Sequence, residues 1–307
     1  NNNMYKNCLI SGGSGMVGQN LQKIMPDAVY LSSRDVDLTK MGETYETVKK
    51  YNPDTIIHLA ASVGGIQYNI QNPANIFEDN LLMNIYILKY AHRFGVKRFI
   101  GMLSTCIYPD VAKSYPLKEE QLHEGPPQIT NFGYGYAKRC MAVMIDSYNK
   151  QYGTKYSYLI PSNLYGYGDS YGEDKSHFVA SLIRKIHEAK KSGSDKIVLF
   201  GNGMPLRQFM IASDLAKVIK LCVENDITES FNVSPDEVYS IKEIAKIALK
   251  ACDADHLKIE FDESKPNGQM NKTASNAKMK SIFPDIQFTS LFEGIKQTYN
   301  QYEADQR

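Results

Sequence analysis

The 307-residue chain carries 35 basic and 34 acidic residues, so no overall electrostatic field favours nucleic acid or an anionic membrane surface. Its five cysteines are an odd number without a Cys-x-x-Cys spacing, which argues against a disulfide framework and a zinc site and favours a reducing, cytoplasmic setting. No apolar stretch approaches the roughly 20 residues of a membrane-spanning helix, and the amino end lacks a signal-peptide pattern, so we expect no membrane association.

Strands and helices alternate through the first half of the chain. Apolar periodicity predicts strands at 8–10, 28–31, 55–61 and 98–103, and helices at 16–25 and 76–94. This alternation is typical of a doubly wound α/β fold, in which parallel strands are joined by crossover helices and ligands bind at the carboxyl ends of the strands. The loops at 12–18, 60–65 and 104–109 follow strand ends and are therefore candidate binding loops.

The pattern becomes irregular after a predicted helix at 134–152 and a predicted strand at 156–160. The elements still predicted beyond that point are a helix at 178–189, a strand at 196–200 and an amphipathic helix at 241–251. We interpret residues 1–163 as a dinucleotide-binding domain, with later sheet elements contributed from about 205–235. Residues 164–307 would then form mainly a smaller α/β substrate lobe.

A glycine-rich turn, Gly12-Gly13-Ser14-Gly15-Met16-Val17-Gly18, lies between the first predicted strand and the first predicted helix. Glycines permit a tight turn and close backbone approach, and the amino end of the helix would face a dinucleotide pyrophosphate. A plain tight turn would use glycine too, so the motif alone is weak. The second strand ends at Ser32-Ser33-Arg34 rather than at an acidic residue, which favours the 2′-phosphate of NADP. Asp35 and Asp37 could contact adenine or cap the loop.

Tyr134 and Lys138 are four residues apart in a predicted helix, so both side chains lie on one face. A lysine ammonium there favours tyrosinate, and we expect it to lower the pKa of the phenol toward a value at which it exchanges a proton with a substrate oxygen. Ser104, at a strand end, could donate a second hydrogen bond to that oxygen. A chance pair on a surface helix is the alternative for Tyr134 and Lys138 alone. Together with the glycine turn, they indicate nicotinamide-dependent hydride transfer.

These motifs resemble the extended short-chain dehydrogenase/reductase family. Segments similar to members that act on GDP-linked keto sugars span nearly the whole chain, at 60–66, 103–109, 131–139, 161–166, 176–177, 201–203, 207–209, 261–262 and 272–276. The resemblance implies a Rossmann-type sheet, NADPH as the hydride donor, a GDP-sugar substrate and a homodimer paired through helices that include 134–152.

The resemblance also implies the reaction, which is 3,5-epimerisation and 4-keto reduction of GDP-4-keto-6-deoxy-D-mannose to GDP-L-fucose. A 4-ketone acidifies the hydrogens on C3 and C5, and each inversion needs an acid and a base that flank the sugar. By resemblance, Cys106 is the base and His177 is the acid, while Ser104 and Tyr134 stabilise the enolate oxygen. Taken alone, Cys106 would more often be a buried apolar residue, and His177 a helix cap or a satisfied polar residue.

The resemblance further implies which residues contact the two ligands. The expected cofactor contacts are Gly12, Gly13, Ser14, Gly15, Met16, Val17, Gly18, Ser33, Arg34, Asp37, Leu38, Ala60, Ala61, Leu103, Tyr134, Lys138, Pro161, Asn163, Leu164 and His177. The sugar nucleotide needs cations for its diphosphate and a flat surface for guanine. The expected substrate contacts are Ser104, Cys106, Asn163, Lys185, Phe200, Arg207, Asn267 and Lys272. Arg207 could instead form a salt bridge inside the lobe.

Other functions fit the sequence less well. The same fold and cofactor could serve another GDP-4-keto sugar, or could support reduction without epimerisation. A catalytically silent nucleotide sensor typically loses the tyrosine or the lysine of the pair, and both are present. A 4-epimerase that keeps its NAD bound has no need of Cys106 and His177. We therefore expect an NADP-dependent oxidoreductase that is also an epimerase, with no metal in its site.

Overall fold

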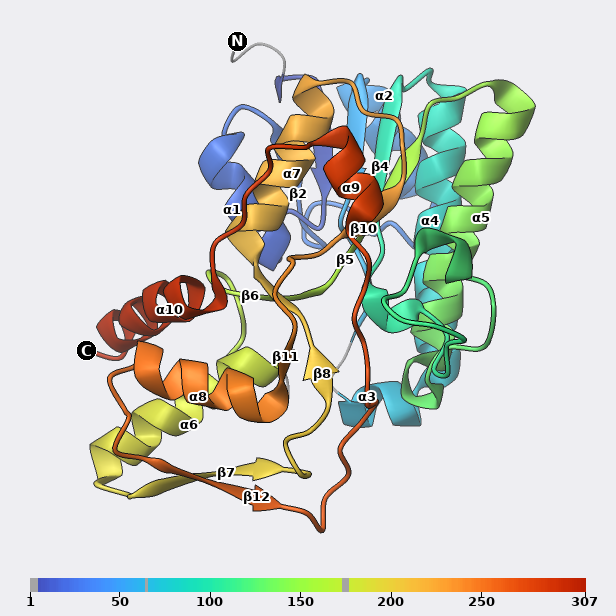
Figure 1. The fold of residues 1–307 in the computed structure, drawn as a ribbon. Helices are drawn as coiled ribbons and strands as arrows, with labels where there is room; N and C mark the ends of the chain where they lie inside the picture. Colours follow the sequence, from blue (N-terminus) through green and yellow to red (C-terminus); the bar gives the residue numbers. More distant parts are fainter. Residues whose placement is uncertain (1–4, 64–65, 173–176) are drawn as a thin grey trace.

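The structure is a computed structural model that describes residues 5–63, 66–172 and 177–307. At its centre is a six-stranded sheet in the order β10-β5-β4-β3-β1-β2, with every neighbouring pair parallel (Figure 1). Its strands are β1 (Cys8–Ser11), β2 (Val29–Leu31), β3 (Thr55–His58), β4 (Arg98–Met102), β5 (Ser157–Pro161) and β10 (Phe231–Val233). The predicted doubly wound parallel sheet is therefore confirmed.

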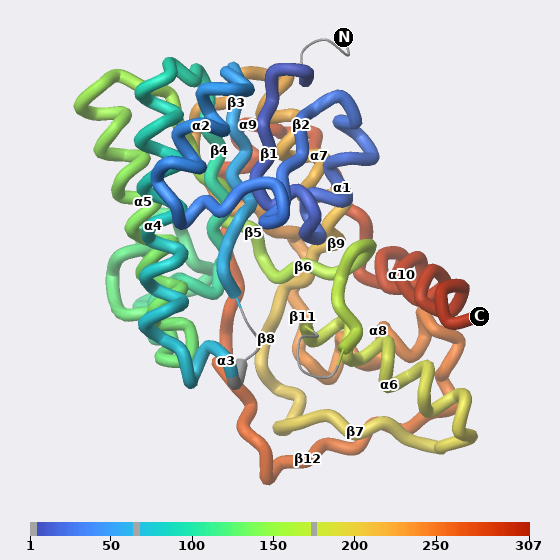
Figure 2. Tube along the Cα trace, turned by 180° about the vertical axis from the view of Figure 1, so that it is seen from behind, coloured from blue at the N-terminus to red at the C-terminus, as the bar shows by residue number. Residues whose placement is uncertain are grey.

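Helices cover both faces of this sheet, and their apolar sides supply two separate cores. One face is covered by α2 (Met41–Tyr51), α4 (Pro73–Arg93) and α5 (Phe132–Tyr152), and the other by α1 (Met16–Ile24), α7 (Ala212–Glu224) and α9 (Ala277–Ile282). Ile87 and Ile56 belong to the first core, and Leu21 and Ile10 to the second. Figure 2 shows α4 and α5 side by side on one face of the sheet. Because both faces are covered, β1 and β3 are buried along their whole length.

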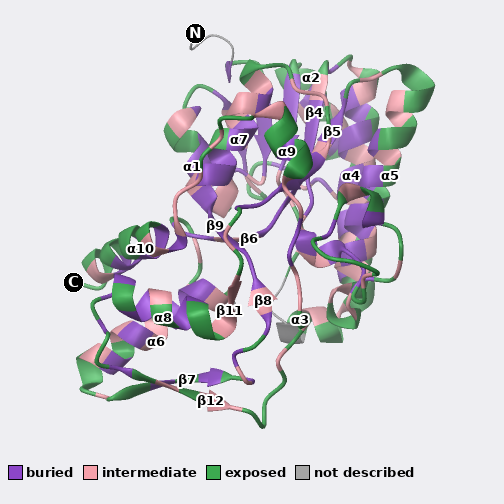
Figure 3. Ribbon diagram, in the orientation of Figure 1, coloured by how far each residue is buried: buried purple, intermediate pink, exposed green. Residues whose placement is uncertain are grey.

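A second group of elements lies beyond the carboxyl ends of the strands, in the lower part of Figure 1. It consists of α6 (Phe178–Ser192), α8 (Ile241–Ala251), α10 (Leu291–Asp305) and a parallel pair formed by β7 (Lys196–Phe200) and β12 (Lys258–Asp262). A third core that includes Ile183, Ala245 and Ile295 holds these helices together. Figure 3 shows their buried sides turned toward one another and their exposed sides outward.

Short elements join the sheet to this second group. The strand pairs are β6 (Asn163–Tyr165) with β9 (Phe209–Ile211), which is parallel, and β8 (Leu206–Arg207) with β11 (Tyr239–Ser240), which is antiparallel. The remaining helical turns are α3 (Ile66–Gln71), η2 (Thr105–Ile107), η3 (Glu119–Gln121) and η4 (Ile129–Asn131). The chain therefore passes several times between the sheet and the second group.

The predicted strand at 55–61 is too long at its carboxyl end, because β3 ends at His58. The backbone amides of Leu59 and Ala60 donate hydrogen bonds to Ser11 Oγ, at 3.0 and 3.2 Å. The chain thus leaves the sheet just beyond His58. It does so beside the end of β1, where the glycine-rich turn begins.

A chain of buried hydrogen bonds continues from Ser11 to helix α5. Ser11 Oγ lies 2.7 Å from His58 Nδ1, His58 Nε2 lies 2.8 Å from Asn84 Oδ1, and Asn84 Nδ2 donates to the Ala137 carbonyl at 3.4 Å. Asn84 Oδ1 can only accept, so Nε2 carries the proton and Nδ1 accepts from the Ser11 hydroxyl. His58 is therefore neutral, and it links β1 and β3 to the helix that carries Lys138.

Replacing His58 with alanine is expected to lower the free energy of unfolding by roughly 3 kcal/mol at neutral pH, because it leaves a cavity and two unpaired polar groups. Burial lowers the pKa of His58 to about 3. An unfolded histidine binds its proton near pH 6.5, so the stabilisation from His58 is present above that pH and is lost as the pH falls toward 3. Urea unfolding of the wild type and of His58→Ala at pH 7.5 and pH 5 measures this difference in the free energy of unfolding. An equal difference at the two pH values would contradict a neutral His58.

Candidate active site

The glycine-rich turn joins β1 to α1 beside the point where the strand order reverses. Gly12 has a φ of +64°, and a Cβ on it would lie 2.6 Å from the Ala60 backbone nitrogen. A Cβ on Gly18 would lie 2.4 Å from the Gly13 carbonyl oxygen, so the turn and the helix are in close contact. Gly15 is the N-cap of α1 and provides no side-chain cap. Among the described residues no side chain caps the first amides of α1, and the turn fits a dinucleotide pyrophosphate.

The loop after β2 uses both of its carboxylates internally. Asp35 Oδ2 accepts hydrogen bonds from the backbone and hydroxyl of Ser32, at 2.8 and 3.2 Å. Asp37 Oδ1 accepts from the backbone and hydroxyl of Thr39, at 3.0 and 2.6 Å, and these bonds lower the pKa of Asp37. Asp37 thus caps the loop, while Arg34 is exposed at its rim. A rim with a guanidinium and hydroxyl groups fits a 2′-phosphate better than a pair of ribose hydroxyls.

The structure brings four of the five predicted catalytic side chains together where β4 ends against α5. Lys138 is buried, donates from Nζ to the Met102 carbonyl at 2.8 Å, and lies 5.7 Å from the centre of the Tyr134 ring. Ser104 Oγ accepts from the Cys106 backbone amide at 3.3 Å, at the start of η2. Cys106 is close enough to interact electrostatically with both Tyr134 and Lys138. Cys106 and Tyr134 also pack against the same core, on the α5 side of the sheet.

The expected lowering of the Tyr134 pKa is wrong for this structure. Burial raises the pKa of the Tyr134 phenol, and a negative charge on Cys106 raises it further. The same burial lowers the pKa of Lys138 to about 8, and its ammonium donates to the Met102 carbonyl. Desolvation thus outweighs the attraction between the two side chains. A phenol that stays protonated suits the direction of reaction in which Tyr134 donates a proton to a substrate oxygen.

His177, the fifth predicted catalytic residue, lies at the N-cap of α6. His177 thus occupies the capping position, but its side chain makes no capping hydrogen bond and is 69% exposed. His177 Nδ1 lies 3.3 Å from Asp169 Oδ1, and this hydrogen bond raises the pKa of His177. Ser176 lies outside the described residues, as do Gly64 and Gly65 of the predicted loop at 60–65.

Two predicted substrate residues, Arg207 and Lys272, lie near each other and near Cys106. Burial lowers the pKa of Lys272, and its charge interacts with Cys106, Arg207 and Asp110. Arg207 is 8% exposed and donates to the Leu206 carbonyl at 2.8 Å. Among the described residues no ion pair of Arg207 is found, so the salt-bridge interpretation is not supported. A buried guanidinium and a partly buried ammonium near the thiol fit a diphosphate.

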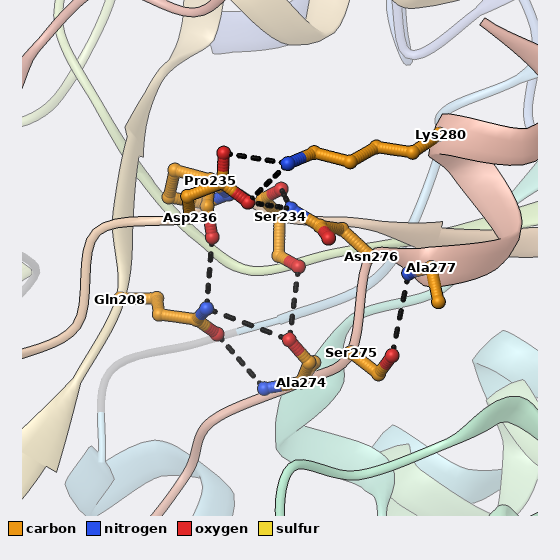
Figure 4. A network of polar contacts seen from close by, with 9 residues as sticks. All are labelled: Gln208, Ser234, Pro235, Asp236, Ala274, Ser275, Asn276, Ala277 and Lys280. Carbon is orange, nitrogen blue, oxygen red and sulfur yellow. Dashed lines mark hydrogen bonds and ion pairs between the residues drawn. The ribbon is translucent and has the colours of Figure 1, made fainter. Parts of the chain in front are cut away.

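A hydrogen-bond network joins the chain segments that carry these two cations (Figure 4). Gln208, next to Arg207, donates to the Pro235 carbonyl at 2.9 Å and accepts from the Ala274 backbone amide at 2.8 Å. Ser234 Oγ donates to the Ala274 carbonyl at 3.1 Å. The network fixes the segment after Lys272 against β8 and β9, although the two segments are far apart in sequence. The sequence segments 207–209 and 272–276 thus meet at one place.

The other predicted nucleotide contacts gather at the end of β7. Phe200 is 61% exposed, and Lys185 Nζ lies 5.4 Å from the centre of its ring and donates to the Val198 carbonyl at 3.2 Å. Asn267 Oδ1 accepts from the Asn202 backbone amide at 2.7 Å. The amide oxygen of Asn267 is therefore used within the chain, which leaves its nitrogen for a ligand. An exposed ring beside an ammonium offers a surface on which a base can stack.

The remaining predicted cofactor contacts follow the carboxyl edge of the sheet. Ala60 and Ala61 follow β3, Leu103 follows β4, and Pro161 ends β5 just before Asn163 and Leu164 of β6. Ser33 lies in the loop after β2, and Ser14, Met16 and Val17 lie at the start of α1. Leu38 is buried in the core on the α2 side. These predicted contact residues therefore lie along the carboxyl edge of the sheet or at the start of α1. The buried side chain of Leu38 is the exception.

Known proteins of similar sequence have the same fold. Residues 8–234 match the model of the NAD dependent epimerase/dehydratase family. The chain belongs to this family. A GDP-L-fucose synthase of Dictyostelium discoideum is 37% identical over 94% of this chain and 93% of its own. A GDP-L-colitose synthase of Yersinia pseudotuberculosis is 32% identical over 94% and 96% of the two chains. A solved GDP-L-fucose synthetase from Naegleria fowleri bound to NADP has a TM-score of 0.85 and 32% identity, covering 97% and 94%.

In this epimerase/dehydratase chain, several site residues were not predicted from the sequence. Asp169 pairs with His177, and Arg139 donates to the carbonyls of Ile107 and Gly125, at 2.8 and 2.6 Å, which holds the turn that carries Cys106. The sequence signal that could have identified Asp169 is its position as a carboxylate in the polar loop before His177.

In the described ranges, no three His, Cys, Asp or Glu residues are grouped closely enough to hold a metal ion. No helix of the described part is long and apolar enough to cross a membrane.

Proposed function

We propose that this chain catalyses the NADPH-dependent 3,5-epimerisation and 4-keto reduction of GDP-4-keto-6-deoxy-D-mannose to GDP-L-fucose. The observation that carries the proposal is the position of Cys106 beside the Tyr134–Lys138 pair. A simple reductase needs only the pair, whereas inversion at carbon needs a further proton-transfer group next to the carbonyl. Relatives named GDP-L-fucose synthase support the same reaction.

In the proposed epimerisation, the Cys106 thiolate removes the proton from C3, and later from C5, of the 4-keto sugar. The Ser104 and Tyr134 hydroxyl groups donate hydrogen bonds to the C4 oxygen, which carries the enolate charge. His177 is protonated more readily than an ordinary histidine and returns a proton to the opposite face of the carbon. Solvent then restores the proton on His177 and removes the one on Cys106.

In the proposed reduction, Tyr134 donates its phenol proton to the C4 oxygen and regains it from solvent. NADPH supplies the hydride for C4 when it is bound. The raised pKa of Tyr134 keeps the phenol protonated until that step. Lys138 holds its position through the Met102 carbonyl and provides a positive charge beside the phenol. One oxygen site thus serves the enolate first and the alkoxide afterwards.

The proposed binding arrangement follows the strand edge. Residues 12–18 hold the pyrophosphate of the cofactor, and Ser33 with Arg34 holds its 2′-phosphate. Arg207 and Lys272, with Lys185, hold the diphosphate of the sugar nucleotide, and Phe200 stacks on guanine. Residues 1–163 act as the dinucleotide domain, joined by β10, and residues 164–307 act mainly as the substrate lobe. We also propose a cytoplasmic homodimer that pairs through the face containing α5.

Replacing Arg34 with alanine is expected to raise the KM for NADPH by about 10- to 100-fold, because it removes a charge-assisted hydrogen bond to the 2′-phosphate. NADH lacks this phosphate, so its KM should stay within about twofold. Steady-state kinetics with each cofactor measure both values. An equal rise in the KM values for NADPH and NADH would mean that Arg34 does not bind the 2′-phosphate.

The function is tested by incubating the purified protein with NADPH and GDP-4-keto-6-deoxy-D-mannose and identifying the product by NMR. GDP-L-fucose is the expected product. The Yersinia relative carries another sugar in its name, so a second GDP-4-keto sugar is assayed in parallel. Faster turnover of that second sugar would contradict the proposed substrate. A reduced product that keeps its original configuration at C3 and C5 would exclude epimerisation and would show that the protein is a 4-reductase only.

A further inference from the structure

Asp169 carries an unusually buried carboxylate in the loop that follows β6. Its side chain is 3% exposed, and Oδ1 accepts from the Ser170 backbone amide at 2.9 Å and pairs with His177 Nδ1 at 3.3 Å. The second oxygen, Oδ2, is buried, and no partner for it is found among the described residues. A buried carboxylate with one unsatisfied oxygen is costly unless a cation lies beside it. Among the described residues, the ion-pair partner of Asp169 is His177, whose ring carries a positive charge when it is protonated.

The pairing determines which nitrogen of His177 can react. A carboxylate only accepts hydrogen bonds, so Nδ1 of His177 carries a proton and donates it to Asp169. The ring is held by this bond while most of the side chain is exposed. Nε2 is therefore the nitrogen left to meet a ligand. The carboxylate also stabilises the charged ring, in which both nitrogens carry protons.

We propose that Asp169 is a positioning residue that orients His177 and keeps its ring protonated, so that the Nε2 proton can be delivered to the sugar carbon during epimerisation. This inference rests on the proposed function. In the step, the new C–H bond takes the Nε2 proton, the imidazolium becomes neutral imidazole, and solvent restores its proton. Asp169 accepts the Nδ1 hydrogen bond of His177 throughout and never contacts the sugar.

Other charged and titratable groups near this pair do not replace His177. Tyr171 follows Asp169 in the same loop, and burial together with the Asp169 charge raises the pKa of its phenol. The ring of Tyr302 in α10 lies 4.5 Å from that of Tyr171, and the charge of Asp305 also acts on Tyr171. Arg184 of α6 donates to the Tyr171 carbonyl at 2.7 Å and pairs with Glu188 at 3.9 Å. Among the described residues, the ion pair of Asp169 is formed with His177.

Asp169→Asn tests the inference, because asparagine keeps the size of the side chain and removes its charge. Solvent-deuterium incorporation at C3 and C5 is measured by NMR, and NADPH oxidation is measured with the already epimerised ketone. We expect deuterium incorporation to fall about 10- to 100-fold, the effect of losing one charge-assisted hydrogen bond, and reduction to change less than about threefold. The alkaline limb of the epimerisation pH profile should move to lower pH, since His177 then loses its proton more readily. Asp169→Glu should recover part of the rate.

Controls separate this inference from general damage and from failure of the proposed function. Asp195→Asn, an exposed carboxylate between α6 and β7, should leave both rates unchanged. The double variant Asp169→Asn/His177→Gln should be no slower than His177→Gln alone, because Asp169 acts only through His177. Unchanged deuterium incorporation or an unmoved pH profile in Asp169→Asn, or additive losses in the double variant, would overturn the inference. A wild-type protein that incorporates no deuterium would instead overturn the proposed function, and this inference with it.

Discussion

Replacing Tyr134 with phenylalanine is expected to slow NADPH oxidation by about 10²- to 10⁴-fold, the usual contribution of a general acid. The change removes only the hydroxyl group, and the ring that packs against the core is kept. Hydride arrival at C4 would then leave an alkoxide with no proton donor at this position. Steady-state kinetics with GDP-4-keto-6-deoxy-D-mannose and NADPH measure the loss.

Tyr136→Phe is the matched control, because Tyr136 lies on the same helix and packs its ring 4.9 Å from that of Phe132. Its rate should stay within about threefold of the wild type, since removing one surface hydroxyl usually has a small effect. Comparable losses in the two variants would mean that the hydroxyl of Tyr134 has no special role. Nearly full activity of Tyr134→Phe would exclude it as the proton donor.

Cys106→Ser is expected to separate the two halves of the reaction. Deuterium incorporation at C3 and C5 should fall about 10²- to 10⁴-fold, because a serine hydroxyl is a far weaker base than a thiolate at neutral pH. Reduction of the already epimerised ketone should proceed at nearly the wild-type rate, since Tyr134 and Lys138 are unchanged. NMR of the sugar in D2O and NADPH absorbance measure the two rates independently.

The control for this variant is Cys140→Ser, which changes an exposed cysteine of α5 that lies outside the site. Both of its rates should match the wild type. Equal losses of exchange and reduction in Cys106→Ser would contradict the division of roles between the thiol and the phenol. Full exchange in Cys106→Ser would show that another group removes the proton.

The sheet was predictable from the sequence where its elements are apolar and regularly spaced, as in β1 and α1. α2 was not predicted, because Thr44 and Val48 are its buried residues and no apolar stripe results. α10 was not predicted either, and two of its buried positions are Gly294 and Thr298. A Cβ on Gly294 would lie 1.8 Å from the Tyr165 hydroxyl, so close packing rather than hydrophobicity determines that residue.

The site was predictable where one short segment carries the chemistry, as with Tyr134 and Lys138. Contacts between distant segments were not predictable, because many of them use backbone groups that every residue has. Gln208 reaches the Ala274 backbone in this way, and Arg139 reaches the Ile107 carbonyl. The Tyr134 pKa was predicted in the wrong direction because the sequence shows the nearby lysine but does not show how deeply both groups are buried.

One site is expected to perform two inversions and one reduction on the same ketone. The complete reaction is run with the wild-type protein and NADPH in D2O, and the product is examined by NMR. We expect GDP-L-fucose with deuterium at both C3 and C5, and one NADPH consumed for each product molecule. A reduced product with hydrogen retained at C3 and C5 would contradict this expectation.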